Sequence, residues 1–522
     1  MQPIPLDTSD FTYIRQHGQK YIDKTGYLHR LITDPNCHVF FLSRPRRFGK
    51  SLMISTLKAI FQGRKELFEG LDIARTDYGW TAHPVINLNM GFCASENYDQ
   101  FAQNLPREIE RGLAEAGYEY DESRSYANNF GHAIDVLADS GRPPVILVDE
   151  YDDPVAKTLK NIEVAERVRN DLATIYNQLK DRSGKIRFLM VTGVSKFTKM
   201  SIFSVFSNLK DISLDDRHAT MLGFTEAELD RYYGDYMTAH AAVMGMDADA
   251  YRAELKRMYN GYRFGCENEE TVYNPVSINI ALTDQKRWFT CGWNETGRPS
   301  MLMNFLKRND FLALDPDKGL KATARDFDVT DLARIQLKGL LFQTGYLTIK
   351  DFNPFSQTFT LGIPDAEVRR DYALLMASLI GNGTDTWASA IGQHLLCFEW
   401  DEFFSGLTAL YAGVAYGSTE KRICEYSYGR CLSFLLQGQG IVCQPEVVQA
   451  DGRVDMVCVH PCGIFIFELK VGRPVGVAMD QIQRKNYAAP YVADDRPVWL
   501  VGLSFDPKTR QLVGCAKENY RP

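Results

Sequence analysis

The sequence predicts an α/β protein in which a parallel sheet is followed by a mainly helical middle and a β-rich C-terminal part. Near-continuous apolar runs alternate with helical segments in the first 200 residues, as expected for strands buried on both faces of a parallel sheet. Residues from about 220 to 390 have a helical, less regular pattern, and GNGTDT (381–386) is the best linker candidate. We therefore expect domains at 1–220, 221–390 and 391–522.

The first part is expected to hold four strands: HVFFLS (38–43), PVINLN (84–89), PPVILVD (143–149) and IRFLMVT (186–192). Segments with helical spacing lie between them, which completes the βαβα alternation of an α/β domain. The helical middle is expected to open with GFTEAELDRYY. There Thr225 is a candidate N-cap, and Glu228 three residues later would complete a capping box.

The composition is that of a globular protein, with 45 % hydrophobic residues and a net charge of -7. No window approaches the roughly 18 consecutive apolar residues of a membrane span, and the N-terminus lacks the pattern of a signal peptide. The 11 cysteines include no CxxC pair. We therefore expect reduced thiols, a cytoplasmic location and no membrane partner. The negative charge argues against a protein that coats DNA constitutively.

The stretch RPRRFGKS (44–51) reads as a phosphate-binding loop that lacks its first glycine. The usual loop is G-x-x-x-x-G-K-[ST], and here Gly49, Lys50 and Ser51 keep their places between an apolar strand and a helix. We expect Lys50 to reach the terminal phosphates of ATP and Ser51 to hold Mg²⁺. Positive charge beside the anion is expected from three arginines: Arg44, Arg46 and Arg47.

The acids that complete such a site follow the apolar run VILVD. Asp149 is expected to bind the Mg²⁺ shell and Glu150 to polarise the attacking water. A strand ending in solvated carboxylates is the alternative. One extra strand, 84–89, lies between the two motifs, which is the order of the additional-strand P-loop ATPases that include AAA+ proteins. After the next strand, Ser195 or Lys196 is the candidate sensor of the γ-phosphate, with a plain loop as the alternative.

The C-terminal stretch DGRVDMVCVHPCGIFIFELKVG predicts a β-hairpin whose strands are joined by a four-residue turn, 460–463. If Val459 faces Ile464 across this turn, Asp455 lies opposite Glu468. Their side chains then share one face of the hairpin, because successive side chains of a strand alternate between faces.

The same register gives the hairpin one charged and one apolar face. Arg453 lies opposite Lys470 on the charged face. The apolar face is expected to carry six core residues: Val454, Met456, Cys458, Phe465, Phe467 and Leu469. An edge hairpin with a mixed charged face is the alternative, but the IFIF segment is too apolar for a solvated edge strand.

Two directly opposed carboxylates repel each other, and a divalent cation would remove that cost. We therefore expect Asp455 and Glu468 to bind Mg²⁺, and Lys470 to orient the attacking water or stabilise the phosphorane formed during cleavage of a phosphodiester. The neighbouring CVHPC sequence could also suggest a metal. A tight turn is the better interpretation, because zinc sites usually bring a second ligand pair.

Several stretches together resemble the bacterial AAA-ATPase-like family: YIDKTGYLHRLI, FLSRPRRFGKSL, VILVDEYDDP, VTGVSKFTKMSIFSVFSNL and NGYRFG with VYNPVSI. The resemblance covers roughly residues 5–285. In that family the phosphate loop is typically written with RPRRFGKS, so the resemblance implies that the missing glycine is a family trait. Members of the family often carry a C-terminal domain of the PD-(D/E)XK nuclease superfamily.

Residues from about 405 to 510 resemble such a nuclease domain. In PD-(D/E)XK nucleases a Gln or Lys of the following helix supports the site, and AMDQIQRKNYAA presents Gln481 and Lys485 four residues apart. The stretch KRICEYSYGRCLSFLL resembles the first helix of that fold. Glu425 sits where a helical Glu often completes the metal shell, although EYSYGR departs slightly from the usual form.

Together these patterns predict an ATP-binding AAA-like ATPase fused to a Mg²⁺-dependent nuclease-like domain that cleaves nucleic acid under ATP control. One rival is a nucleotide-dependent switch whose nuclease fold only binds nucleic acid or protein, and another is a scaffold with a structural hairpin. Residues 401–522 carry 13 basic and 13 acidic side chains. This balance gives no broad electrostatic footprint for duplex DNA, so substrate binding could depend on the ATPase part or a partner. The sequence leaves a homo-oligomer open.

Overall fold

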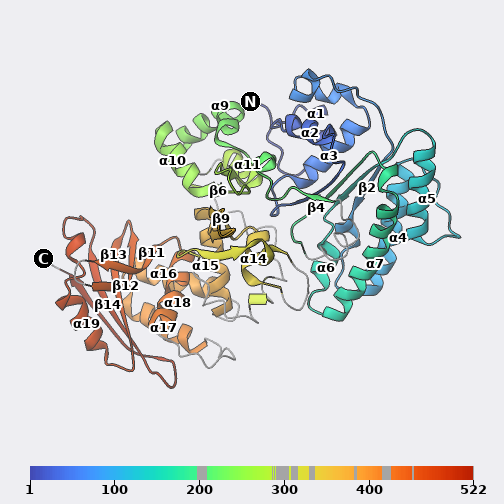
Figure 1. Cartoon of the computed structure of the whole chain (residues 1–522). Coiled ribbons are helices and arrows are strands. Elements are labelled where there is room, and N and C mark those ends of the chain that lie inside the picture. Colours follow the sequence, from blue (N-terminus) through green and yellow to red (C-terminus); the bar gives the residue numbers. More distant parts are fainter. Residues whose placement is uncertain are drawn as a thin grey trace. The chain divides into compact units, whose positions relative to one another are not determined.

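The computed structural model (Figure 1) divides the chain into two compact units. The described residues are 1–196, 209–284, 316–328, 335–380, 385–413, 425–449 and 452–520, with a few single positions between 286 and 306. The first unit comprises Met1–Phe305 and Pro316–Asp365, and the second Leu306–Asp315 and Ala366–Pro522. The domain boundaries expected at 220 and 390 stay predictions. Residues 381–384 of the expected linker lie outside the described residues.

The first unit is built on the predicted parallel sheet. Its strands are β1 (Val39–Ser43), β2 (Val85–Asn89), β3 (Val145–Asp149), β4 (Phe188–Gly193) and β5 (Lys210–Asp211). They lie in the order β2-β3-β4-β1-β5, and every pair is parallel. β1, β3 and β4 are buried along their whole length, which explains their continuous apolar sequences. Because parallel strands end at one edge, the loops after β1, β3 and β4 meet there.

Helices and short 3-10 turns surround this sheet (Figure 1). The helices are α1 (Phe11–Gln16), α2 (Thr25–Ile32), α3 (Lys50–Phe61), α4 (Tyr98–Glu115), α5 (Tyr126–Asp139), α6 (Asp153–Thr158) and α7 (Ile162–Asp181). The 3-10 turns are η1 (Lys65–Phe68), η2 (Asp72–Arg75), η3 (Met90–Cys93), η4 (Ser183–Lys185) and η5 (Asp216–His218). Two elements matter for the site: α3 begins directly after the phosphate-binding loop, and η3 directly follows β2.

The middle of the chain is helical, as expected, but it also contains strands that its irregular pattern did not indicate. Its helices are α9 (Glu226–Met244), α10 (Ala248–Tyr259), α11 (Pro275–Thr283), α13 (Ala324–Phe327) and α14 (Leu337–Gln343). Its strands are β6 (Asn260–Tyr262), β7 (Val272–Tyr273), β8 (Leu320–Thr323), β9 (Thr348–Asn353) and β10 (Thr358–Gly362). β8, β10 and β9 form a small antiparallel sheet. The predicted capping box of Thr225 and Glu228 is confirmed.

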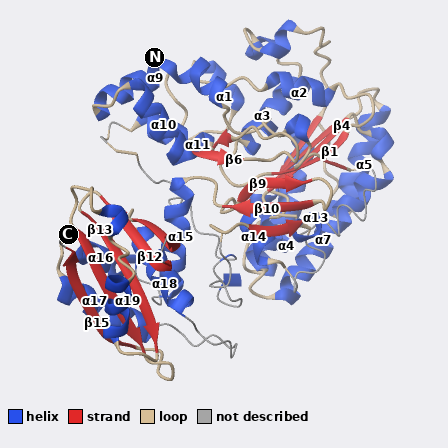
Figure 2. Ribbon diagram, turned by 60° about the vertical axis from the view of Figure 1, so that its left-hand side comes forward, coloured by secondary structure: helices blue, strands red, loops and turns tan. Residues whose placement is uncertain are grey.

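The second unit is a five-stranded sheet with helices packed on it (Figure 2). The helices are α15 (Ala366–Ile380), α16 (Asp385–Leu396), α17 (Trp400–Gly413), α18 (Glu425–Gly438) and α19 (Val475–Arg484), with the 3-10 turn η9 (Ala489–Tyr491). The strands are β11 (Val442–Gln449), β12 (Gly452–His460), β13 (Gly463–Val471), β14 (Val498–Phe505) and β15 (Leu512–Tyr520). Adjacent strands lie in sequence order, and only β13 and β14 are parallel.

The hairpin of β12 and β13 has the predicted register, with Val459 opposite Ile464. His460 also pairs with Gly463, so the turn has two residues, 461–462, and not the four predicted. The CVHPC stretch is thus a tight turn. Within the described part of the chain, no helix is long and apolar enough to cross a membrane.

Candidate functional site

The loop between β1 and α3 has the local geometry of an anion site. Gly49 has a φ of 87° and is the N-cap of α3. Glycine adopts this left-handed conformation without a steric penalty. Lys50 and Ser51 then form the first turn of the helix. The unpaired N–H groups and the positive end of the helix dipole at this terminus favour a bound anion.

Lys50 is folded back onto its own loop. Its Nζ donates to the carbonyl oxygens of Arg44 and Pro45, both at 2.9 Å. Burial lowers the pKa of Lys50 to about 8, although Asp149 and other nearby acids act in the opposite direction. Because carbonyl dipoles replace only part of the lost hydration, a phosphate oxygen would be a stronger partner for this ammonium group.

The two predicted acids lie at the end of β3. Oδ1 of Asp149 accepts from Thr192 Oγ1 at 2.6 Å, which fixes the carboxylate against β4. Glu150 has a φ of 52°, a left-handed conformation that is costly for a residue with a side chain. Burial, with the charges of Asp149 and Asp153, raises the pKa of Glu150. Because a raised pKa means that the carboxylate binds a proton more tightly, Glu150 is suited to accept one.

The three arginines of the loop do not act alike. Arg46 is half exposed and lies 3.5 Å from Asp153. Arg47 has a φ of 68° at the bend of the loop. Arg44, expected beside the anion, is instead buried in the interior, where its guanidinium donates to backbone carbonyls such as that of Ser213 at 2.6 Å. The expected position of Arg44 beside the anion is therefore wrong, whereas the roles of Arg46 and Arg47 beside a phosphate stay predictions.

The loop after β4 is tied to the β3 loop by Asp152, which the sequence analysis did not single out. Its carboxylate accepts from the backbone N–H groups of Val194 at 3.1 Å and Ser195 at 2.7 Å, and also from the Ser195 hydroxyl. The Lys196 ammonium is paired with Asp211 at 2.6 Å. Ser195 is thus bonded to Asp152 of the β3 loop and Lys196 to Asp211 of β5, and the role of either residue with a γ-phosphate stays a prediction. Asp152 was visible in sequence only as the third acid of DEYDDP.

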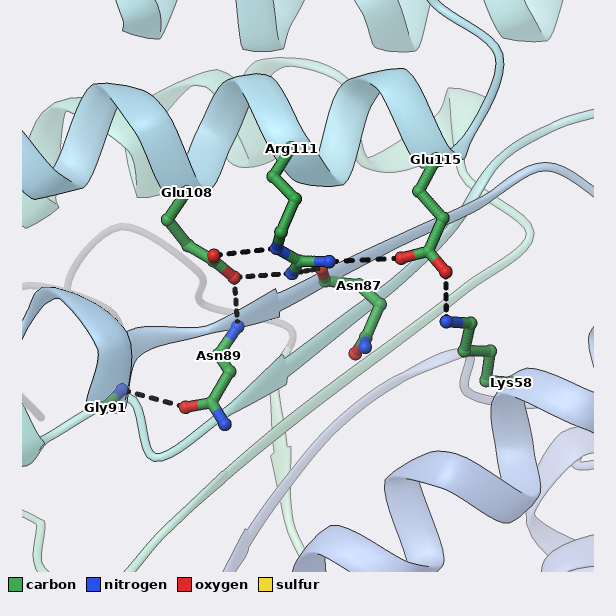
Figure 3. Close-up of polar contacts among 7 residues, drawn as sticks. All are labelled: Lys58, Asn87, Asn89, Gly91, Glu108, Arg111 and Glu115. Carbon is green, nitrogen blue, oxygen red and sulfur yellow. Dashed lines mark hydrogen bonds and ion pairs between the residues drawn. The ribbon is translucent and has the colours of Figure 1, made fainter. Parts of the chain in front are cut away.

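Side chains of α4 cover the free edge of β2, which has β3 as its strand partner (Figure 3). Glu108 accepts from the backbone N–H of Asn89 at 2.7 Å, and Arg111 donates to the carbonyl of Asn87 at 2.7 Å. Glu108 and Arg111 also bond each other at 2.6 and 2.8 Å. Glu108 thus acts as acceptor and Arg111 as donor for backbone groups of β2 that a neighbouring strand would otherwise bond. These bonds fix the end of β2.

Gly91 in η3 determines where the Glu150 carboxylate lies. Its backbone N–H donates to the Asn89 side chain at 2.9 Å (Figure 3). A Cβ atom at position 91 would lie 2.0 Å from Oε2 of Glu150. Only a residue without a side chain leaves room for the carboxylate here. No sequence motif indicated Gly91, because its contact with Glu150 exists only in the folded sheet.

In the second unit, Glu468 and Lys470 form a buried pair on β13. The Lys470 ammonium donates to Oε1 of Glu468 at 2.7 Å and to the carbonyl of Leu469 at 3.0 Å. Oε2 of Glu468 is buried and has no hydrogen-bond partner among the residues that the structure describes. Burial, with the nearby charge of Asp455, raises the pKa of Glu468 to about 7. A buried carboxylate oxygen without a protein partner is able to accept a further donor or to bind a cation.

Asp455 lies where the hairpin opens. Backbone pairing of β12 with β13 ends at Met456 and Phe467, one pair before the expected Asp455–Glu468 pair. Beyond this point Oδ2 of Asp455 accepts from the backbone N–H of Leu469 at 2.7 Å. Burial raises the pKa of Asp455, while this hydrogen bond and the charge of Lys470 oppose the shift. The predicted Asp455–Glu468 backbone pair is therefore absent from the described ladder, although the charge of Asp455 still contributes to the raised pKa of Glu468.

The opening of the hairpin also corrects two expectations about its faces. Val454 was expected on the same face as Met456, but it packs with Val457 and residues of α19 in the opposite core cluster. Arg453, expected opposite Lys470, lies beyond the residues of β12 that pair with β13. It pairs with Val448 of β11 and forms an ion pair with Glu446 at 3.1 Å. Both changes follow from the end of regular pairing at Met456, where the strict alternation of side chains is lost.

The remaining predicted residues flank this site. Glu425 begins α18, accepts from the Val471 backbone N–H at 3.2 Å and lies 4.0 Å from the Lys470 ammonium. Gln481 of α19 donates to the Tyr487 hydroxyl at 3.4 Å, and that hydroxyl bonds the carbonyl of residue 453. Lys485 is the C-cap of α19, and its backbone N–H donates to the carbonyl of Gln481 at 3.0 Å, so the two residues are one helical turn apart as predicted. The structure thus brings Glu425 near the Lys470 ammonium. It links Gln481 through the Tyr487 hydroxyl to the carbonyl of Arg453 in β12.

The donor set suits a hard cation with few protein ligands. Within the described ranges, no group of three or more His, Cys, Asp or Glu side chains is arranged to hold a metal. Mg²⁺ commonly binds through one or two carboxylates and fills its other positions with water and substrate phosphates. Asp455 and the orphaned oxygen of Glu468 fit that requirement, as do Ser51 and Asp149 in the first unit.

Comparison with known proteins finds a family model over each of the two parts of the chain that contain these residues. A family model described as a predicted AAA-ATPase matches residues 5–203, and a model of the PD-(D/E)XK nuclease superfamily matches residues 425–514. A protein of Azotobacter chroococcum mcd 1, titled "Uncharacterized protein in vnfD 5'region", is 32% identical over 534 residues, covering 99% of each chain. No solved structure matches. The chain therefore belongs to the AAA-ATPase-like family and carries a C-terminal PD-(D/E)XK nuclease superfamily domain.

The contact of Gly91 with Glu150 can be tested by adding one methyl group. Gly91→Ala should displace the Glu150 carboxylate and lower the expected rate of ATP hydrolysis ten-fold or more. A ten-fold loss corresponds to an increase of about 1.4 kcal/mol in activation free energy. The affinity for ATP should stay unchanged, because Lys50 is not displaced. Gly184→Ala is the matched control, since nothing lies within 4 Å of the added methyl. Equal hydrolysis rates in Gly91→Ala and wild type would contradict the interpretation.

The raised pKa of Glu468 predicts a pH dependence of stability without metal. The ordinary value is 4.5 and the folded value about 7, so between them the native state retains a proton that the unfolded state has lost. The contribution of Glu468 to stability is therefore present below pH 4.5 and is lost as the pH rises through 7. Calorimetric melting of Glu468→Gln should lack this loss, whereas the exposed-site control Glu402→Gln should keep it. Parallel pH curves for wild type and Glu468→Gln would refute the assignment.

Proposed function

We propose that the chain binds and hydrolyses ATP with Mg²⁺ at the loop between β1 and α3, and that this controls Mg²⁺-dependent cleavage of nucleic acid in the second unit. The proposal of nucleic-acid cleavage rests on Oε2 of Glu468, which is buried near Asp455 and Lys470 and has no partner among the described residues. We also propose a cytoplasmic protein, and a homo-oligomer stays an open alternative to a monomer.

The arrangement around Lys50 supports the ATPase half. On nucleotide binding, Lys50 would exchange its two carbonyl partners for the terminal phosphates, and the N-terminus of α3 would bind the same anion. Ser51 and Asp149 would hold Mg²⁺, which supplies charge neutralisation at the phosphates. Glu150 would take a proton from the attacking water, because its carboxylate is buried and disfavours the charged form.

The second site supports hydrolysis of a phosphodiester. Asp455 and Glu468 would hold Mg²⁺, whose charge would relieve their repulsion and polarise the scissile phosphate. Water would attack phosphorus, the bond to one sugar oxygen would break, and that oxygen would leave with a proton. The Lys470 ammonium lies between Glu468 and the carbonyl of Leu469, where it can orient the water or stabilise the negative charge of the transition state.

One observation favours the alternative of a domain that only binds nucleic acid or protein. Glu468 and Lys470 neutralise each other at 2.7 Å, as a purely structural ion pair also would. The two functions differ in what happens to a nucleic-acid substrate when Mg²⁺ is added, so the experiments below separate them.

The ATPase half predicts different defects for two variants. Lys50→Ala should abolish binding of a fluorescent ATP analogue, because the ammonium that reaches the phosphates is lost. Glu150→Gln should keep binding and stop hydrolysis, because only the group that activates water is changed. Equilibrium titration and phosphate release measure the two effects. Unchanged affinity in Lys50→Ala would rule out the nucleotide site.

The nuclease half predicts cleavage of at least one member of a panel of single- and double-stranded DNA and RNA, assayed with and without ATP and Mg²⁺. Asp455→Asn should lose cleavage yet melt no lower than wild type without metal, because it removes a like-charge repulsion. Lys470→Ala should keep the Mg²⁺-induced rise in melting temperature and lose cleavage. Asp480→Asn, an exposed position on α19, is the control. Binding of nucleic acid without cleavage by wild type would favour the alternative.

A further inference from the structure

The NGYRFG segment, residues 260–265, has no role in the site described so far, although its side chains are deeply buried. Tyr262 is 1 % exposed, Arg263 6 % and Phe264 4 %. The segment begins as strand β6 and lies in the first unit with the phosphate-binding loop. A run of three large polar or aromatic side chains is rarely buried in a turn unless neighbouring elements need its contacts.

Two of these side chains contact the phosphate-binding loop directly. The guanidinium of Arg44 lies over the Phe264 ring, 4.1 Å from its centroid. The Phe48 ring meets Tyr262 and Phe264 edge-on, with centroids 4.8 and 5.3 Å apart. Phe48 itself is 1 % exposed. The loop is therefore held at its first residue and at the residue directly before Gly49.

Arg44 occupies the position at which the usual loop has its first glycine. Its guanidinium donates to the carbonyl of Ser43 at 3.0 Å, to that of Ser213 at 2.6 Å and to that of His218 at 3.3 Å. Its own carbonyl accepts from Lys50. Arg44 thus connects Lys50, which would bind phosphate, to the backbone carbonyls of Ser213 and His218.

The NGYRFG segment is in turn fixed to the small sheet of the first unit. The Tyr262 hydroxyl donates to the carbonyl of Gly345 at 2.9 Å, and the backbone N–H of Arg263 donates to Thr348 Oγ1 at 2.8 Å. Gly261 has a φ of 143°, and a Cβ there would lie 2.1 Å from the carbonyl oxygen of Pro364. These contacts leave the segment little freedom to shift under the loop.

We propose that Tyr262 and Phe264 are positioning residues for nucleotide binding: they hold Arg44 and Phe48 so that Lys50 and the N–H groups of the loop converge on a phosphate. The proposal rests on the proposed ATP site and adds to it the surface that shapes the loop. The aromatic faces stabilise the guanidinium in its buried position, and that position sets the bend that a first glycine provides elsewhere. The segment would therefore determine ATP affinity without touching ATP.

A double-mutant cycle tests this proposal through ATP affinity. Phe264→Ala should raise the Kd of a fluorescent ATP analogue at least ten-fold, whereas Phe264→Tyr, which keeps the ring face, should restore affinity to within about three-fold of wild type. The hydrolysis rate at saturating ATP should change much less than the affinity. Phe355→Ala is the control, because Phe355 is 97 % exposed in the same unit. In an Arg44→Gly background, Phe264→Ala should raise the Kd by a smaller factor than in wild type, because only the contact with Phe48 then remains to be lost.

A second measurement does not depend on ATP. Hydrogen exchange of the backbone amides at 46–49 should be faster in nucleotide-free Phe264→Ala than in wild type, and unchanged in Phe355→Ala. Unchanged exchange, or equal effects of Phe264→Ala with and without Arg44, would overturn the positioning role. If wild type bound no ATP but the exchange result held, the positioning of the loop would stand and the proposed ATPase function would fall.

Discussion

Charged side chains that fold away from water must find partners, and this constraint arranges both candidate sites. Removing an ion from water costs several kcal/mol unless other charges or dipoles replace the lost hydration. Lys50 and Arg44 meet this cost with backbone carbonyls, and Glu468 with Lys470. Each site holds a buried lysine close to carboxylates, with three of them acting on Lys50 and Glu468 bonded to Lys470. In the first site we propose that a phosphate replaces the carbonyl partners of Lys50. In the second, one oxygen of Glu468 has no hydrogen-bond partner within the described part of the chain.

Much of the fold and of the site could be predicted because it depends on local patterns. The apolar runs gave the four long strands of the parallel sheet, since strands buried on both faces need apolar side chains throughout. The sequence GKS placed Gly49 and Lys50 at a helix N-terminus. The alternation of side chains fixed the hairpin register of Val459 and Ile464, and with it the approach of Asp455 to its acidic neighbour.

The parts that sequence did not indicate depend on contacts between distant segments. The buried direction of Arg44 follows from carbonyls near residues 213–218 and from the Phe264 ring, which no local pattern relates to the loop. The capping of the β2 edge by Glu108 depends on how α4 packs. The alternation rule failed at Val454, because the strands separate there and Asp455 replaces a backbone partner with its side chain.

The anchoring of Arg44 shows that the phosphate loop depends on residues outside the segment by which the family is recognised. The segment matched by the ATPase family model ends at residue 203, yet the carbonyls and rings that hold Arg44 belong to residues 213–218 and 264. A piece cut at the end of the match would carry every signature residue of the phosphate loop but not the surface beneath it. The segment needed to hold the loop in this conformation is therefore longer than residues 5–203, by which the family is recognised.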